Sequence, residues 1–195
     1  NYFGGGALVI SQNSLSSPSS DFWKYENNNF VKLPSLPFTA VNSLSFELNN
    51  KLFVMGGAVG FGTDVYRFNI STGQWQKIAN SPFAVNRTVL NFSYDNKQYL
   101  VDPVTKEIYA FDGDLETWSF YGIYPGDINS GSAFGVTIGD RVVTGMANRS
   151  QEVWELNLSN GLWVRKNIFP GNPIARNVGV YVHDNLIYIL RSAEV

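Results

Sequence analysis

The sequence predicts an all-β fold built from repeated four-stranded antiparallel sheets. The first observation behind this prediction is that three series of residues recur with one period of about 44 residues. The second is that each period holds four short segments in which apolar and polar residues alternate. No segment has the apolar spacing of an amphipathic helix. A period of about 40 to 50 residues with four strands is typical of a β-propeller blade.

The three recurring series are in phase with one another. Two of them are aromatic and one consists of polar residues that favour turns. One twisted four-stranded sheet cannot cover both of its faces, so we expect the sheets to stack around an axis with the large rings between neighbours. The series are Phe30, Trp75, Trp118 and Trp163; Trp23, Tyr66, Tyr109 and Trp154; and Asn50, Asn96, Asp140 and Asn185.

The second unit shows the four strands most clearly. They read SLSFEL, KLFVMGG, DVYRFN and QWQKI. Asn49 and Asn50 are placed to join the first two strands in a tight hairpin. The turn ISTGQ joins the last two, with Gly73 available for a positive φ.

The repeat divides the chain into a single propeller region of five ranges. These are a partial unit at 1–38, units at 39–83, 84–125 and 126–170, and a partial unit at 171–195. The chain begins near the second strand of one blade and ends after the first two strands of another. About four blades are visible, and we expect them to be part of a six- or seven-bladed ring. The alternative is a four-bladed ring in which the C-terminal strands complete the N-terminal blade.

Residues 51–83, KLFVMGGAVGFGTDVYRFNISTGQWQKIANSPF, resemble the kelch repeat. Gly56 and Gly57 match its diglycine, Tyr66 its aromatic residue and Trp75 the Trp of its last strand. The resemblance implies a kelch-type propeller and covers nearly the whole chain, but the copies are uneven. The third unit has YLVDPVTKE in place of the diglycine, and the fourth keeps only Gly145.

Composition excludes several classes of function. The net charge is -2 and Lys and Arg form no run, so we expect no nucleic-acid partner. Without Cys there is neither a disulfide nor a thiolate metal site, and the single His183 cannot make a multi-His centre. The copper-radical oxidases that share kelch blades use Cys, Tyr and His ligands, so that activity is not expected.

We therefore expect no metal and no cofactor. We also expect no membrane span, since no apolar run reaches about 18 residues. The absence of Cys with abundant Asn, Ser and Tyr mildly favours an exported bacterial protein. Oligomeric state stays open.

Binding residues of a propeller are expected on the loops that share one face. These are the loops between second and third strands, at 58–63, 102–106 and 146–151, and the crossings between blades, at 34–42, 80–87, 124–132 and 169–177. The candidate ligand-binding residues on them are Arg87, Arg176, Arg149, Phe61, Tyr124 and Asp127.

These residue types suit a carboxylate or a sugar. Arginines offer forked donors to either group, and Phe61 and Tyr124 could stack on a sugar or a peptide side chain. The alternative for Arg87 and Arg176, which fall where kelch repeats often carry Arg, is that they tie adjacent blades through backbone carbonyls. His183 falls in a turn, and Asp112 and Asp114 are read as turn formers rather than a calcium loop.

The function expected from this pattern is a non-catalytic scaffold that binds a protein segment or a carbohydrate through its face loops. The alternative is a sugar-processing enzyme, for example of the sialic-acid-converting type, with its site in the propeller mouth. A third possibility is a structural domain of a larger surface protein. No catalytic residue can be named from the sequence.

Overall fold

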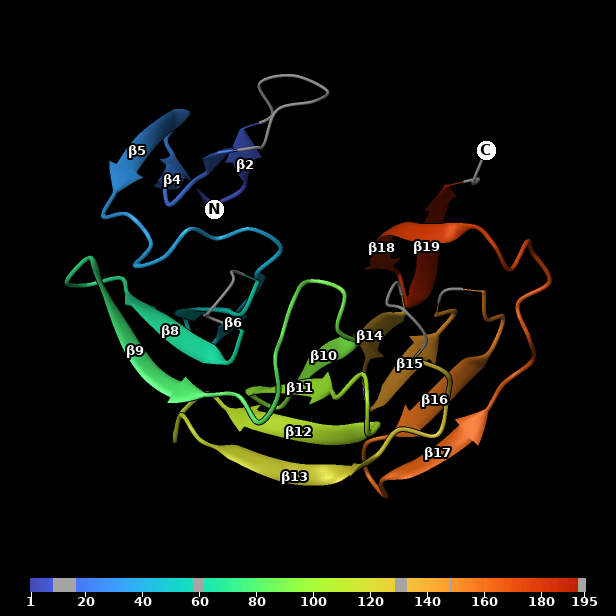
Figure 1. Cartoon of the computed structure of the whole chain (residues 1–195). Helices are drawn as coiled ribbons and strands as arrows, with labels where there is room; N and C mark the ends of the chain where they lie inside the picture. The colour runs from blue at the N-terminus through green and yellow to red at the C-terminus, as the bar shows by residue number, and fades with distance from the viewer. Residues whose placement is uncertain (9–16, 58–61, 129–132, 148, 193–195) are drawn as a thin grey trace. The chain divides into compact units, whose positions relative to one another are not determined.

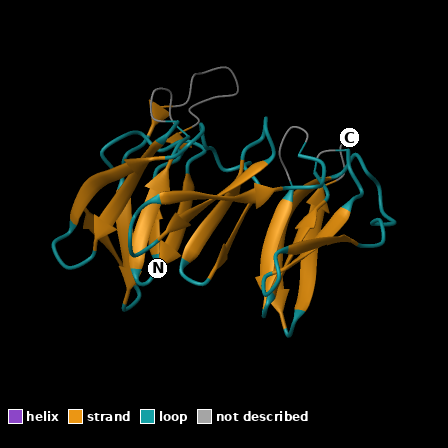
Figure 2. Ribbon diagram, turned by 90° about the horizontal axis from the view of Figure 1, so that it is seen from below, coloured by secondary structure: helices purple, strands orange, loops and turns teal. Residues whose placement is uncertain are grey.

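The computed structural model describes residues 1–8, 17–57, 62–128, 133–147 and 149–192. They belong to two compact units, Asn1–Arg87 and Thr88–Val195, which are treated separately below. Figure 2 shows strands and loops, with no helix among the described residues. The predicted all-β class is confirmed.

The first unit holds one four-stranded sheet, one three-stranded sheet and a short ladder (Figure 1). The four-stranded sheet runs β6–β7–β8–β9, and the three-stranded sheet runs β1–β4–β5. The strands are β1 (Tyr2–Gly4), β2 (Ala7–Leu8), β3 (Ser17–Pro18), β4 (Phe22–Glu26), β5 (Asn29–Leu33), β6 (Leu44–Leu48), β7 (Lys51–Met55), β8 (Asp64–Asn69) and β9 (Gln74–Asn80). The β2–β3 ladder is an addition that the sequence pattern did not predict.

The second unit holds two four-stranded sheets, β10–β11–β12–β13 and β14–β15–β16–β17, and the hairpin β18–β19. Every pairing in these sheets is antiparallel and joins strands consecutive in sequence. The strands are β10 (Asn91–Tyr94), β11 (Lys97–Val101), β12 (Glu107–Asp112), β13 (Trp118–Ile123), β14 (Phe134–Ile138), β15 (Arg141–Gly145), β16 (Val153–Asn157), β17 (Leu162–Arg165), β18 (Arg176–His183) and β19 (Leu186–Ser192).

The polar series marks the hairpins between first and second strands, as predicted. Asn49 and Asn50 have φ of 44° and 58°, the left-handed geometry of a two-residue hairpin turn. The pairs Asp95–Asn96 and Asp184–Asn185 repeat it. In the hairpin between β14 and β15, Gly139 has φ 58° and takes up this conformation beside Asp140.

A second turn device closes the hairpins between third and fourth strands. Asn69 Oδ1 accepts hydrogen bonds from the N–H groups of Ser71 (3.0 Å) and Thr72 (3.1 Å). Asp112 and Asn157 accept hydrogen bonds from the equivalent pairs of N–H groups in the next two four-stranded sheets. The sequence reading of Asp112 as a turn former is confirmed, because its oxygen is used by the backbone.

The first aromatic series occupies the same register position in each of the four larger sheets. Trp75 lies opposite Phe68, Trp118 opposite Phe111 and Trp163 opposite Leu156. Phe30 lies opposite Tyr25 in the same way. Residues that recur in the sequence with one period therefore also recur at one position in the sheets.

The core of the first unit lies between its two sheets. Phe22 from β4 packs edge-on against Phe68 and Trp75, with ring centroids 5.0 and 5.1 Å apart. Leu36 and Phe38, from the crossing between the sheets, are buried in the same cluster. This is the aromatic seam expected between neighbouring blades.

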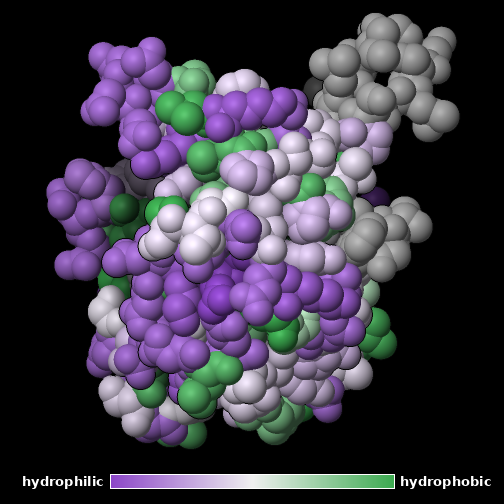
Figure 3. Space-filling model, turned by 90° about the vertical axis from the view of Figure 1, so that its left-hand side faces the viewer, coloured by the Kyte–Doolittle hydropathy of each residue, from purple (hydrophilic) through white to green (hydrophobic). Residues whose placement is uncertain are grey.

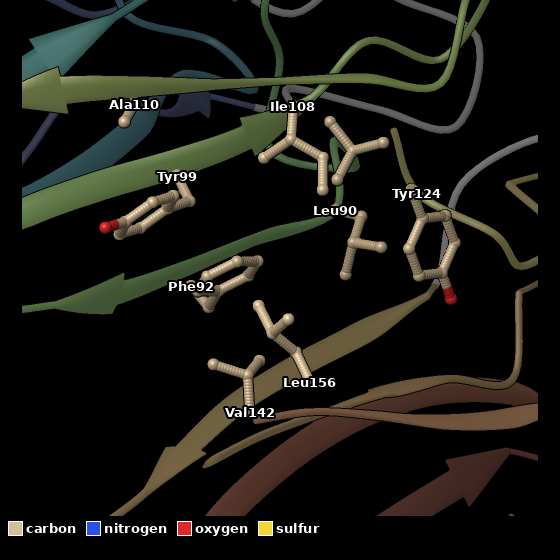
Figure 4. Packing of buried hydrophobic residues seen from close by; sticks show 9 residues of the cluster. Leu90, Phe92, Tyr99, Ile108, Ala110, Tyr124, Val142 and Leu156 are labelled. Carbon is tan, nitrogen blue, oxygen red and sulfur yellow. The ribbon is translucent and has the colours of Figure 1, made fainter. Parts of the chain in front are cut away.

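The core of the second unit has the same design (Figure 4). Tyr99 and Ile108 from one sheet meet Val142 and Leu156 from the next, and all four are buried. Trp163 packs against this cluster from the outer strand β17. Burial of the apolar faces between the sheets is the main stabilising contribution here.

The outer side of the first unit is largely polar. Figure 3 views the side of the molecule that carries β5 and β9, and it shows mainly hydrophilic residues with small hydrophobic patches between them. On β9, Gln74, Gln76 and Lys77 are exposed. This matches strands with one buried and one solvated face.

The diglycine is required by close approach of the backbone. Gly56 has φ 63°, and a Cβ there would lie 1.9 Å from the Val85 carbonyl oxygen. Gly57 has φ 82° and donates its N–H to the same oxygen at 2.9 Å. Only glycine fits both constraints, which explains the motif in this unit.

Candidate functional site

The four larger sheets repeat an acidic residue at the start of the third strand. These residues are Asp21, Asp64, Glu107 and Glu152. In three of the sheets this carboxylate accepts a hydrogen bond from the aromatic residue two positions on, from Tyr66 (3.4 Å), Tyr109 (2.8 Å) and Trp154 (3.3 Å). The bond to Glu107 raises the pKa of Tyr109, because it stabilises the neutral phenol.

A cation on the fourth strand completes this arrangement in three of the four sheets. Asp21 pairs with Lys32 (3.1 Å), Asp64 with Lys77 (2.7 Å) and Glu152 with Arg165 (3.0 Å). In the remaining sheet Phe120 occupies the cation position. A charge pair repeated at one register position is best explained as part of the blade.

A polar hollow of about 490 Å³ opens at one end of the two four-stranded sheets of the second unit. It is lined by the β11–β12 loop, the crossing to β14, the β15–β16 loop and the end of β17. The lining residues are Lys106, Pro125, Gly126, Asp127, Arg149, Ser150, Gln151, Glu152, Arg165 and Ile168. Loops carried on rigid strands are a common place for binding residues.

Glu152 ties the wall of this hollow together. One carboxylate oxygen accepts the N–H of Asp127 (3.2 Å) and the indole N–H of Trp154 (3.3 Å). The other oxygen pairs with Arg165. The carboxylate thus joins the crossing loop, β16 and β17, and its hydrogen-bonding capacity is largely used within the protein.

Two cations in the hollow are engaged differently. Lys106 donates from Nζ to the carbonyl oxygen of Gly126 at 2.9 Å, which uses one of its three donors. Arg149 is exposed at a left-handed position with φ 62°. Among the described residues, its guanidinium has no hydrogen-bond or ion-pair partner.

The structure brings together two of the six residues predicted to bind a ligand. Arg149 and Asp127, from loops expected on one face, both line the hollow of the second unit. Asp127 is half-buried there. The other four residues lie elsewhere.

Tyr124 differs from its predicted role. It was expected to stack on a ligand, but its side chain is only 1% exposed. Its ring packs edge-on against Trp163 at 5.3 Å, and its hydroxyl accepts a hydrogen bond from Thr144 at 3.2 Å. Burial raises the pKa of Tyr124 to about 12. The ring belongs to the seam between sheets and offers no face to a ligand.

Arg87, Arg176 and Phe61 are separate from the polar hollow. Arg87 lines a different hollow, of about 420 Å³, between the two sheets of the first unit, together with apolar residues such as Phe22 and Val54. Arg176 is exposed at the start of β18 and does not line the polar hollow. Phe61 lies outside the described residues.

Arg191 holds crossing-loop carbonyls, a task that the sequence reading had considered for Arg87 and Arg176. Its guanidinium donates to the carbonyl oxygens of Asn172 (2.8 Å) and Ala175, and it lies over the ring of Phe169 at 4.9 Å. Burial lowers its pKa, since the charged form loses hydration. Nothing in the local sequence SAEV that follows it signals this role.

Lys106, Glu152 and Arg165 were also missed from the sequence. For Glu152 a signal existed, because an acidic residue stands two positions before each member of the second aromatic series. For Arg165 the signal was a basic residue two positions after three of the four members of the first aromatic series. For Lys106 there was none, since the equivalent positions hold Ser20, Thr63 and Gln151.

In the described part of the chain, no group of three or more His, Cys, Asp or Glu side chains is arranged to hold a metal ion. A search of the same residues also finds no helix long and apolar enough to cross a membrane.

Comparison with known proteins gives a match to a family model and similarity to solved structures. The kelch motif matches residues 43–82, the span of the β6–β9 sheet. A solved structure titled "Structure of YjhT" is similar with a TM-score of 0.70 and 15% sequence identity, over 85% of this chain and 64% of that one. This chain thus spans less than two thirds of that structure. No curated protein matches the sequence.

The matched motif, the similar structure and the repeated sheets all indicate a propeller built from kelch-type blades. Kelch propellers generally act as binding scaffolds that mediate protein interactions. The match over residues 43–82, the similar solved structure and the repeated four-stranded sheets support a kelch-type β-propeller fold for this chain.

Proposed function

We propose that this protein is a non-catalytic binding module that receives a segment of a partner protein at the polar hollow of its second unit. The observation that supports this most directly is the lining itself. Charged and amide side chains from three loops are held at one end of two packed sheets, and Lys106 and Arg149 keep donors that no described residue uses. A rigid base with exposed donors suits the recognition of an extended polar segment.

The chemistry of Glu152 supports binding over catalysis. A general acid or base must exchange its proton with a substrate. The Glu152 carboxylate instead accepts two N–H donors and pairs with Arg165, so it acts as a fixed part of the wall.

A neutral carbohydrate is a weaker candidate for the ligand. Sugar sites commonly use an aromatic ring as a stacking surface, and the described residues that line the hollow include none. Tyr124, the aromatic residue predicted for that role in this unit, is buried.

The experiment is selection of displayed random peptides against the whole chain, in parallel with a glycan array. Binding is mapped by amide chemical shifts in two-dimensional NMR. We expect peptides to be enriched and to shift the amides of Gly126, Ser150 and Gln151, with no change at the opposite turn around Asp140. Enrichment of glycans alone, chemical conversion of a bound sugar, or shifts confined to the turn end would overturn the proposal.

A further inference from the structure

We propose that the polar hollow recognises a carboxylate, and that the partner segment which occupies it is acidic. The inference rests on the proposed function and adds the chemistry of recognition. Arg149 and Lys106 are the residues that would hold the carboxylate.

Some of the charged side chains that line the hollow pair with each other as part of the repeated sheet, and the others do not. Three cations and two acids line it: Lys106, Arg149, Arg165, Asp127 and Glu152. The Arg165–Glu152 pair has counterparts at the same register in two other sheets, so it is explained by the blade. Lys106, Arg149 and Asp127 remain, and together they carry one positive charge.

The two remaining cations have no counterpart in the repeat. The positions equivalent to Arg149 are Phe61 and Val104, and those equivalent to Lys106 are Ser20, Thr63 and Gln151. Side chains that depart from a repeated pattern without serving the blade are candidates for function.

The donors of these side chains suit a carboxylate. The bond from Lys106 to Gly126 fixes the direction of its ammonium group, and no other described residue takes its remaining two donors. The guanidinium of Arg149 presents a planar fork that matches the two oxygens of a carboxylate. The negative charge of Asp127 would repel a bound anion. Its backbone N–H donates to the Glu152 carboxylate, and this bond fixes the position of the crossing loop that carries Asp127.

The carboxylate could come from an acidic peptide or from a sugar acid, and the lining favours the peptide. The described lining residues are mainly polar and hold no aromatic ring to support the body of a sugar. The hollow is formed by loops of two sheets, so an extended chain can pass along it with one acidic side chain between Lys106 and Arg149.

The test measures the affinity of the whole chain for a fluorescent oligoglutamate peptide, its oligoglutamine counterpart and glucuronate. We expect the glutamate peptide to bind best and to lose affinity with added salt. Arg149→Gln and Lys106→Gln should each weaken it about tenfold or more, the typical effect of losing one charge-assisted hydrogen bond. The matched control is Arg141→Gln, which removes the same charge at the opposite end of β15.

Each outcome decides between the two proposals. Enriched peptides that are neutral, or that bind Arg149→Gln as tightly as the unchanged chain, would overturn the carboxylate assignment and leave the binding module standing. Tighter binding of glucuronate than of the peptide would overturn the acidic-segment assignment. Circular dichroism of each variant confirms that its sheets are intact.

Discussion

Replacing Tyr124 by Ala should destabilise the second unit strongly. The ring is 1% exposed and packs edge-on against Trp163 between the two sheets. Removing a fully buried aromatic side chain costs about 3 to 5 kcal/mol, because its transfer energy is lost and a cavity remains. Since domains of this size are stable by about 5 to 15 kcal/mol, the loss is a large fraction of the total.

The matched variant Tyr124→Phe separates the ring from its hydroxyl. It keeps the packing and removes only the hydrogen bond from Thr144, so we expect a cost of about 1 kcal/mol. The difference between the two variants reports the contribution of the ring.

Urea denaturation followed by tryptophan fluorescence and near-ultraviolet circular dichroism measures both variants. The midpoint should fall much further for Tyr124→Ala than for Tyr124→Phe, with unchanged slopes. If Tyr124→Ala is within about 1 kcal/mol of the unchanged chain, the ring does not belong to the core, and the ligand-stacking role predicted from the sequence is restored.

Two further predictions concern the backbone and pH. Gly56→Ala should lower the free energy of unfolding by about 1 to 3 kcal/mol or more, because φ is 63° and the new Cβ would meet the Val85 carbonyl oxygen at 1.9 Å. Thermal unfolding of this variant beside a half-buried Ala79→Gly control measures the loss. Burial raises the pKa of Tyr99 and of Tyr124 to about 12, above the value of about 10 in the unfolded chain. Their stabilisation is therefore complete below pH 10 and is lost as the pH rises toward 12, by up to about 3 kcal/mol for each group; a stability profile that is flat over this interval would contradict it.

The blades could be predicted from the sequence because their signals are local. Asn49 and Asn50 specify a tight turn by their own backbone preferences, and alternation in the flanking segments specifies which side chains are buried. The period then places Trp75, Trp118 and Trp163 at one register, since each is a fixed distance from its turn.

The candidate site could be predicted only in part. Connectivity alone places the loops of Asp127 and Arg149 at the same end of their sheets, and both line the hollow. The contribution of Lys106 was invisible, because its bond to Gly126 joins residues 20 positions apart that meet only through the pairing of β12 with β13 and the path of the chain after β13.

The sequence by itself determined the repeated unit, its strands and its turns, since these depend on neighbours within a few positions. Only the tertiary structure decided that Tyr124 lies inside the seam and Arg149 outside it. Both residues come from loops of similar polarity, and their burial depends on the sheet that packs beside them. That contact is set by residues one repeat away, which no local pattern records.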